Sequence, residues 1–174
     1  MLVSVALNNT QDNPQLIFES MNSTGKDLSQ ADLIRNYILM GQPQDMQNKL
    51  YNTYWRPMEL GFGQQGYTDY FDLFIRDFLT SQNSSGRICK INEVYEAFKQ
   101  YHKNEISTEK LLSQVYTYTQ YYIRIHLGKE VDKDLKALWN EIRILEVSVC
   151  YPFLIRIYND YENNVITKSD FITI

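Results

Sequence analysis

The hydrophobic residues of this chain recur mostly at three- and four-residue spacing, the pattern of a helix that buries one face. A strong example begins at Thr68, which we expect to cap a helix that places Asp72 and Arg76, four positions apart, on its solvent side. Its inward positions are Tyr70, Phe71, Phe74, Ile75 and Phe78. Similar patterns predict further helices over residues 44–59, 91–103, 108–127 and 152–162.

Capping residues and glycines set other boundaries. Ser29, followed three residues later by Asp32, is predicted to cap a helix with a variant of the capping box. Asp132 is predicted to cap a helix over residues 134–149, whose hydrophobic seam is Leu135, Leu138, Ile142, Leu145 and Val149. Three glycines over residues 61–66 predict a loop.

The first residues follow a different pattern. Val3, Val5 and Leu7 alternate with other residues, which predicts a β-strand over residues 2–7. No partner strand is evident in the rest of the sequence, and a strand needs neighbours. We therefore expect the chain to begin within a larger domain. Pro14 then predicts the first turn of a helix that runs to about residue 21.

Composition narrows the class of protein. The chain is 44% hydrophobic and 22% charged, as globular domains are, and 14% aromatic residues with only 7 Gly and 4 Pro favour long packed helices. A net charge of −4 and a pI of 5.2 argue against a stand-alone nucleic-acid-binding domain. No stretch predicts a signal peptide or a membrane span, so we expect no membrane partner. Two cysteines fit a reducing, cytoplasmic location.

The sequence contains no complete pattern for catalysis or metal binding. The possible metal ligands lie at least 13 residues apart, without paired spacing: Cys89, His102, His126 and Cys150. Neither a GxSxG nucleophile motif nor a Walker A motif occurs. The acidic pairs Asp69/Asp72 and Asp132/Asp134 are interpreted as charges at helix starts. We therefore expect no catalytic residue and no metal ligand.

Residues 12–40 combine a proline-started helix, an Asn-Ser-Thr-Gly turn and a capped helix. A turn of this kind beside a helix N-terminus presents backbone N–H groups that suit an anion. Lys26 lies near this turn, and Arg35 and Asn36 project from the next helix. The alternative is a structural joint in which Asp32 and Arg35 form an i,i+3 ion pair, and the residues alone favour it.

The same stretch resembles a known signature. Residues 17–39, IFESMNSTGKDLSQADLIRNYIL, resemble the signature of the GmrSD-type proteins, which are large bacterial modification-dependent restriction enzymes with a ParB-like N-terminal domain. The matching positions are Phe18, Glu19, Asn22, Gly25, Leu28, Asp32, Leu33, Ile34, Arg35 and Asn36. The aromatic helices further along are similar to the helical middle region of that family, more loosely. The resemblance implies a role in restriction and phage defence.

The resemblance also implies a division of the chain. Residues 1–42 would be the C-terminal end of the ParB-like domain and residues 43–174 a helical middle domain. The expected fold is mainly α, a multi-helix, bundle-like domain with a short N-terminal strand left from a truncated ParB-like α/β domain.

Both catalytic centres of the family are missing from the sequence. The family's Asp-Gly-Gln-Gln-Arg motif, associated with nucleotide hydrolysis, and its nuclease domain are not found, and Gly63-Gln64-Gln65-Gly66 lacks the Asp and Arg of the former. We therefore expect no enzymatic activity from this chain alone. A nucleoside triphosphate and a divalent metal would belong to the full-length protein.

Two functions remain open at this point. In the first, the chain is a non-catalytic region that couples nucleotide handling to DNA cleavage, with the rest of its polypeptide and modified DNA as partners. Residues that support the nucleotide pocket would be Asn22, Gly25, Arg35 and Asn36. Residues that hold the structure of the signature would be Phe18, Glu19, Leu28 and Asp32. In the second, favoured by the acidic pI, the chain is a helical protein–protein interaction module with no nucleic-acid role.

Overall fold

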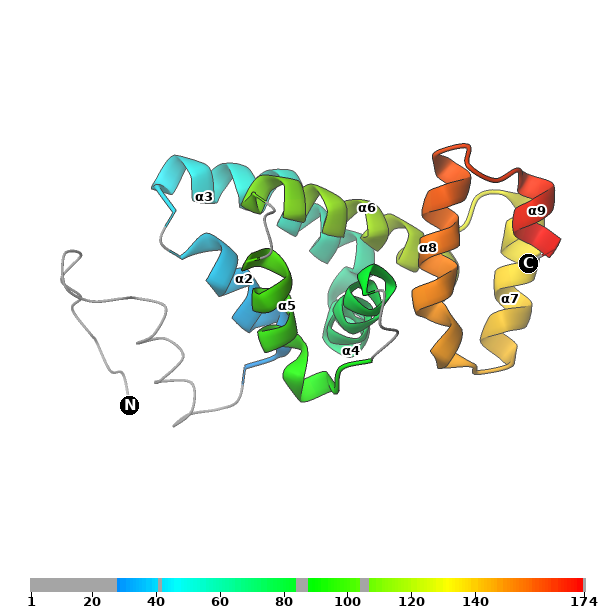
Figure 1. The fold of residues 1–174 in the computed structure, drawn as a ribbon, viewed down its shortest axis with the longest axis horizontal. Helices are drawn as coiled ribbons and strands as arrows, with labels where there is room; N and C mark the ends of the chain where they lie inside the picture. Colours follow the sequence, from blue (N-terminus) through cyan, green and yellow to red (C-terminus); the bar gives the residue numbers. More distant parts are fainter. Residues whose placement is uncertain (1–27, 41, 84–87, 104–106, 174) are drawn as a thin grey trace.

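The computed structural model describes residues 28–40, 42–83, 88–103 and 107–173, and every regular element in these ranges is helical (Figure 1). The α-helices are α2 (Gln30–Leu39), α3 (Gln44–Leu50), α4 (Arg56–Gln82), α5 (Val94–Lys103), α6 (Thr108–His126), α7 (Lys133–Ile144), α8 (Tyr151–Glu162) and α9 (Lys168–Thr173). Shorter turns precede three of them: a π-helical turn before α4 (Tyr51–Trp55) and 3-10 turns before α5 (Ile91–Glu93) and α8 (Ser148–Cys150). The prediction of a mainly α-helical fold is confirmed.

The helix predictions hold to within a residue for three segments. Those over residues 91–103, 108–127 and 152–162 coincide with α5 and its 3-10 turn, α6 and α8. The strand over residues 2–7 and the helix that starts at Pro14 lie outside the described residues, and so does the Asn-Ser-Thr-Gly turn.

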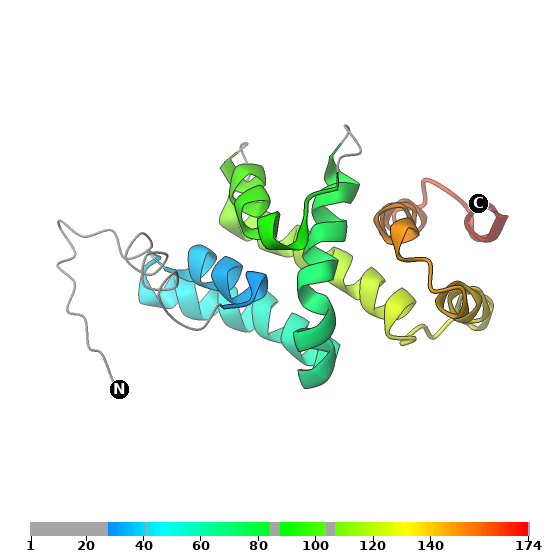
Figure 2. The same ribbon diagram turned by 90° about the horizontal axis from the view of Figure 1, so that it is seen from below.

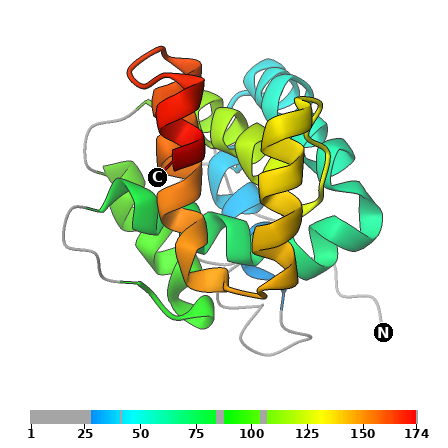
Figure 3. The same cartoon turned by 90° about the vertical axis from the view of Figure 1, so that its right-hand side faces the viewer.

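Helix α4 lies at the centre of the molecule, where it crosses α6 (Figure 2). It also packs against α2, α5 and α8. Helices α7 and α8 run antiparallel at the end that holds the C-terminus, and α9 packs against α8 (Figures 1 and 3). Helix α6 contacts the π-helical turn, α7 and α8, so it connects the two ends of the fold.

Aromatic rings fill the core between α4 and α6. Phe71, Phe74 and Phe78 are fully buried, as predicted, and the ring of Phe74 lies 5.3 Å from the ring of Tyr122 on α6. Burial of each such side chain contributes about 1.5–3 kcal/mol to stability. Tyr70 is only partly buried, because it lies at the edge of this core. The periodic pattern therefore identified the central packing face of the molecule.

The predicted loop over residues 61–66 is wrong, because these residues lie within α4. Gly63 has φ 74° and ψ 164°, a non-helical conformation open to glycine, and it divides α4 into two helical segments that meet at a kink. Thr68 consequently does not cap a helix start, and its hydroxyl donates to the Gln64 carbonyl at 3.1 Å. A Cβ on Gly61 would lie 2.8 Å from Ile123 Cδ1, so a larger residue here would require the Ile123 side chain of α6 to move.

The predicted solvent-side pair of Asp72 and Arg76 is also wrong. Asp72 is partly buried and accepts backbone N–H groups from α2, while Arg76 pairs with the buried Asp77 at 2.9 Å. The interpretation of Asp69 and Asp72 as helix-start charges fails for the same reason, since both lie inside α4. An acidic residue in the middle of one helix here serves the start of another.

Helix α7 begins as predicted and ends early. Asp132 caps it by accepting the backbone N–H groups of Asp134 and Leu135. The helix stops at Ile144 because Glu146 adopts a positive φ of 53°, which a continuing helix cannot accommodate. The last two residues of the predicted seam are therefore wrong as buried positions, since Leu145 is 68% and Val149 74% exposed.

Candidate functional site

The N-terminus of α2, where the described part of the signature lies, has acceptors for all of its first four backbone N–H groups. The Asp72 carboxylate accepts the N–H of Gln30 at 3.0 Å and of Ala31 at 2.7 Å. Ser29 supplies its hydroxyl to the N–H of Asp32 and its carbonyl to the N–H of Leu33. The Ser29 cap is confirmed, and an anion already occupies this helix start: the protein's own carboxylate.

Burial and hydrogen bonding act on Asp72 in opposite directions. Removal from solvent raises its pKa, and the two N–H groups of α2 oppose that rise by stabilising the ionised form. The carboxylate thus binds the positive end of the α2 dipole from the side of α4.

Arg35 lies between two carboxylates one helical turn further along α2. Its guanidinium contacts Asp32 Oδ1 at 2.8 Å and Glu59 Oε1, on α4, at 3.2 Å. The hydroxyl of Tyr51, in the π-helical turn, donates to Glu59 Oε2 at 2.9 Å, and this bond raises the pKa of Tyr51. We call Asp32, Arg35, Tyr51 and Glu59 the Arg35 cluster. It ties α2 to α4 and to the π-helical turn, and its formal charge is −1.

The remaining signature positions divide between described and undescribed parts of the chain. Leu28 is partly buried just before the Ser29 cap, and Asn36 is partly buried on α2. Four positions lie outside the described residues: Phe18, Glu19, Asn22 and Gly25. The structure thus brings Arg35 together with Asp32, as the spacing predicted, and adds Glu59 and Tyr51, which sequence reasoning did not find.

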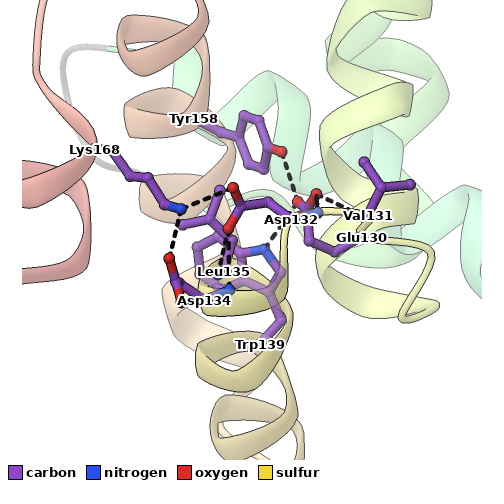
Figure 4. Close-up of polar contacts among 8 residues, drawn as sticks. All are labelled: Glu130, Val131, Asp132, Asp134, Leu135, Trp139, Tyr158 and Lys168. Carbon is purple, nitrogen blue, oxygen red and sulfur yellow. Dashed lines mark hydrogen bonds and ion pairs between the residues drawn. The ribbon is translucent and has the colours of Figure 1, made fainter.

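A second polar centre, which the sequence did not predict, surrounds Glu130 between α6 and α7 (Figure 4). This side chain is 4% exposed, and its Oε1 accepts the backbone N–H of Val131 at 2.8 Å and of Asp132 at 3.0 Å. Its Oε2 accepts the Tyr158 hydroxyl at 2.6 Å and the Trp139 Nε1–H at 3.3 Å. Burial raises the pKa of Glu130, but these four hydrogen bonds outweigh it and lower the pKa below the usual value.

Ion pairs flank the Glu130 centre. Lys168 of α9 reaches Asp132 Oδ2 at 2.8 Å and Asp134 Oδ2 at 2.6 Å, at the start of α7 (Figure 4). Arg124 of α6 contacts the Tyr158 hydroxyl at 3.1 Å and Glu162 at 2.7 Å. Because every carboxylate oxygen of Glu130 is bound by donors of this chain, the centre holds helices together and leaves no free base for chemistry.

The cysteines and histidines lie in packed surroundings. His102 bonds to the Tyr37 hydroxyl at 3.0 Å and to Thr108 Oγ1 at 3.3 Å, so it joins α5 to α2 and α6. His126 lies among tyrosine rings, the nearest being Tyr70 with ring centroids 4.4 Å apart. Burial raises the pKa of both cysteine thiols. Among the described residues, no group of three or more His, Cys, Asp or Glu side chains is arranged to hold a metal ion.

A shallow pocket of about 250 Å³ lies between α3 and the start of α6. Its lining residues are Gln42, Met46, Leu50, Ser107, Thr108 and Glu109. Glu109 pairs with Lys49 at 2.8 Å at the edge of the pocket, so its carboxylate is already neutralised. The lining offers an apolar floor without a buried, unpartnered polar group.

None of the described helices has the length and apolar character needed to cross a bilayer. Comparison of the chain with family models, with curated proteins and with solved structures finds no match.

Proposed function

We propose that this chain is the helical region of a GmrSD-like, nucleotide-dependent restriction protein, and that the Arg35 cluster braces the nucleotide site of that protein. Nucleotide hydrolysis and cleavage of modified DNA are carried out by other parts of the polypeptide. The observation that supports the proposal is the position of Arg35, a matching residue of the signature, between carboxylates of α2 and α4. Nine further signature positions match at the same spacing.

The contacts of Arg35 favour bracing over direct contact with a phosphate. A phosphate at the guanidinium would have to displace Asp32 and Glu59, in a cluster whose formal charge is already −1. The first N–H groups of α2 are occupied as well. In this proposal Arg35 is a positioning residue, because it fixes α2 against α4 through Asp32 and Glu59.

Nucleotide turnover by the full-length protein tests this role. Arg35→Ala is expected to lower turnover by about 10- to 100-fold, because a small displacement of a binding segment costs that much. Lys49→Ala is the matched control, since it removes a comparable ion pair between α3 and α6 and is expected to leave turnover unchanged. Unchanged turnover in Arg35→Ala, or an equal loss in both variants, would contradict the proposal.

Calorimetric titration of nucleoside triphosphates with Mg²⁺ locates the site relative to this chain. Binding that Arg35→Ala abolishes would place part of the pocket in the chain itself. An absence of binding by this chain, with binding by a version extended upstream, would place the pocket in the preceding segment and leave Arg35 its supporting role.

The alternative, a protein–protein interaction module with no nucleic-acid role, is favoured by a different observation. Several large apolar side chains are exposed around the turn between α7 and α8, and the net charge of −4 is unfavourable for a phosphate backbone. A DNA affinity that falls steeply with salt would count against this alternative, because phosphate contacts release counterions.

A further inference from the structure

Three tyrosine rings pack against His126, the last residue of α6. The ring centroids of His126 and Tyr70, on α4, lie 4.4 Å apart. The corresponding distances are 5.1 Å to Tyr122, on α6, and 5.0 Å to Tyr151, on α8. We call Tyr70, Tyr122 and Tyr151 the tyrosine box. Within the described parts of the chain, His126 Nδ1 is buried and has no hydrogen-bond partner, which is rare for a buried polar atom.

A positively charged side chain acts on this histidine from a fourth helix. The guanidinium of Arg143, on α7, packs so closely against Gly128 that a Cβ on the glycine would clash with it, two residues after His126. Among the described residues, no ion pair joins His126 to an acid. The charge of Asp77, on α4, acts on two rings of the box. Burial raises the pKa of Asp77 to about 6, so this negative charge is lost as the solution becomes acidic. A positive charge on His126 would therefore meet Arg143 without a paired carboxylate.

Protonation changes how well the box accommodates the imidazole. In the imidazolium both ring nitrogens are donors, so Nδ1 becomes a buried, charged N–H group without an acceptor. Tyrosine faces attract a cation, but burial and Arg143 lower the pKa of His126, so the surroundings as a whole disfavour the charged form. The negative end of the α6 dipole attracts the imidazolium inside and outside the box alike, and therefore does not hold it there.

The connection that follows His126 is attached at several points. The Leu127 N–H donates to a carbonyl one turn earlier at 3.1 Å and closes the last turn of α6. The Lys129 ammonium donates to the Gly61 carbonyl of α4 at 2.6 Å, at an exposed position. Glu130 then anchors the chain before α7 through four hydrogen bonds. A displaced His126 therefore loosens the residues between it and Glu130 and leaves the contacts of Glu130 in place.

We propose that protonation of His126 moves its ring from the tyrosine box into solvent and opens the connection between α6 and α7, so that this connection is a pH-sensitive switch. In water the new N–H group is solvated and the charge of Arg143 is screened. The opening is local, because the hydrogen bonds of Glu130 to Trp139 and Tyr158 keep α7 and α8 together. The inference does not rest on the proposed nucleotide role.

Amide hydrogen exchange of the purified chain at pH 7.5 and pH 5.5, measured by NMR and corrected for the intrinsic pH dependence of exchange, tests the proposal. The protection of the Leu127 amide is expected to fall by up to about tenfold at the lower pH. That pH is about one unit below the usual pKa of an exposed histidine, and the opening takes up one proton. The Val131 amide, which donates to Glu130 Oε1, is expected to keep its protection. Equal protection of Leu127 at both pH values, or an equal loss at Leu127 and Val131, would overturn the proposal.

Two substitutions separate His126 from other titrating groups. His126→Phe keeps an aromatic ring in the box that cannot gain a proton, and is expected to give the same Leu127 protection at both pH values. His102→Gln is the matched control and is expected to retain the loss in acid, because His102 lies on α5 with partners on α2 and α6. In the wild type, the ring signals of His126 are expected to titrate over the same pH range as the loss of Leu127 protection. A loss that persists in His126→Phe, that His102→Gln abolishes, or that occurs without titration of His126 would contradict the switch.

Discussion

The carboxylate of Asp72, in the middle of α4, accepts the backbone N–H of Ala31 at 2.7 Å and so caps a helix 41 residues earlier in the chain. Caps of this kind usually come from the residue just before the helix. Here Ser29 occupies that position and serves the N–H of Asp32, while Asp72 serves the two donors that remain nearest the helix start. The start of α2 is therefore fixed by tertiary structure as well as by its own sequence.

Replacement of Asp72 is expected to destabilise the protein through α2. Asp72→Ala leaves the N–H groups of Gln30 and Ala31 without their acceptor, at an expected cost of about 1–2 kcal/mol in the free energy of unfolding. Asp69→Ala is the control, because among the described residues its carboxylate accepts a hydrogen bond only from the exposed Gln65 side chain of the same helix. Urea unfolding measures both, and equal midpoints for the two variants would contradict the capping role.

The Glu130 centre predicts a larger effect. The Glu130 carboxylate accepts four hydrogen bonds. In Glu130→Gln one of the two oxygens becomes an NH₂ group that faces donors, so we expect the free energy of unfolding to fall by about 2–4 kcal/mol. The control is Glu162→Gln, because Glu162 is 39% exposed in its ion pair with Arg124. This substitution is expected to lower the free energy of unfolding by about 1 kcal/mol or less. Guanidinium unfolding followed by tryptophan fluorescence compares them. Equal losses of unfolding free energy in the two variants would mean that the buried hydrogen bonds of Glu130 contribute no more to stability than an exposed ion pair.

His126 predicts a loss of stability in acid. Burial, and then the charge of Arg143, lower its pKa, so between that lowered value and about 6.5 the unfolded chain binds a proton that the folded chain does not. The contribution of neutral His126 to the free energy of unfolding is therefore complete above pH 6.5. It is lost as the pH falls, by at most about 1.4 kcal/mol per pH unit.

His126→Phe removes this titration and keeps an aromatic ring among the tyrosines. The unfolding free energy of the wild type is expected to fall relative to that of the variant as the pH falls from 7.5 to 5. His102 is present in both proteins, so its own lowered pKa cancels in the difference. A difference that stays constant over this range would rule out His126 as the source.

Asp77 predicts the opposite dependence. Burial raises its pKa to about 6, and Arg76 only partly offsets this, so between pH 4 and 6 the folded chain binds more protons than the unfolded one. Stability from this group therefore increases as the pH falls through 6. Asp77→Asn is expected to abolish this dependence and to stabilise the protein at pH 8 by about 1–3 kcal/mol. Asp45→Asn serves as the control, because Asp45 is exposed. Thermal melts of both variants and the wild type measure the dependence of the melting temperature on pH. A dependence in Asp77→Asn that equals that of the wild type would contradict the assignment.

The sequence carried enough information to place most helices. The rings of Phe71, Phe74 and Phe78 recur at helical spacing, and burial follows directly from that spacing. The Ser29 and Asp132 caps were predictable for a similar reason, because each acts within three residues of itself. Features determined by near neighbours could be read from the chain.

Features determined by distant neighbours could not. Gly61 and Gly63 resemble loop residues in the sequence, but Gly61 lies against the Ile123 side chain of α6 and Gly63 forms a kink within α4. Glu130 has no periodic signal, and its partner Tyr158 lies 28 residues further on. The pairing of Arg35 with Asp32 followed from their spacing, whereas Glu59 joined them only because α2 packs against α4.

Helix α9 is attached to the rest of the molecule by two contacts of different physical character. Phe171 is 2% exposed and its ring lies 5.4 Å from that of Trp139, whereas Lys168 holds Asp132 and Asp134 at the surface. Dissolved salt weakens the second contact and leaves the first intact. We therefore expect added salt to speed hydrogen exchange at the backbone amides of α9 and to leave the exchange of the amides of α4 and α6 unchanged.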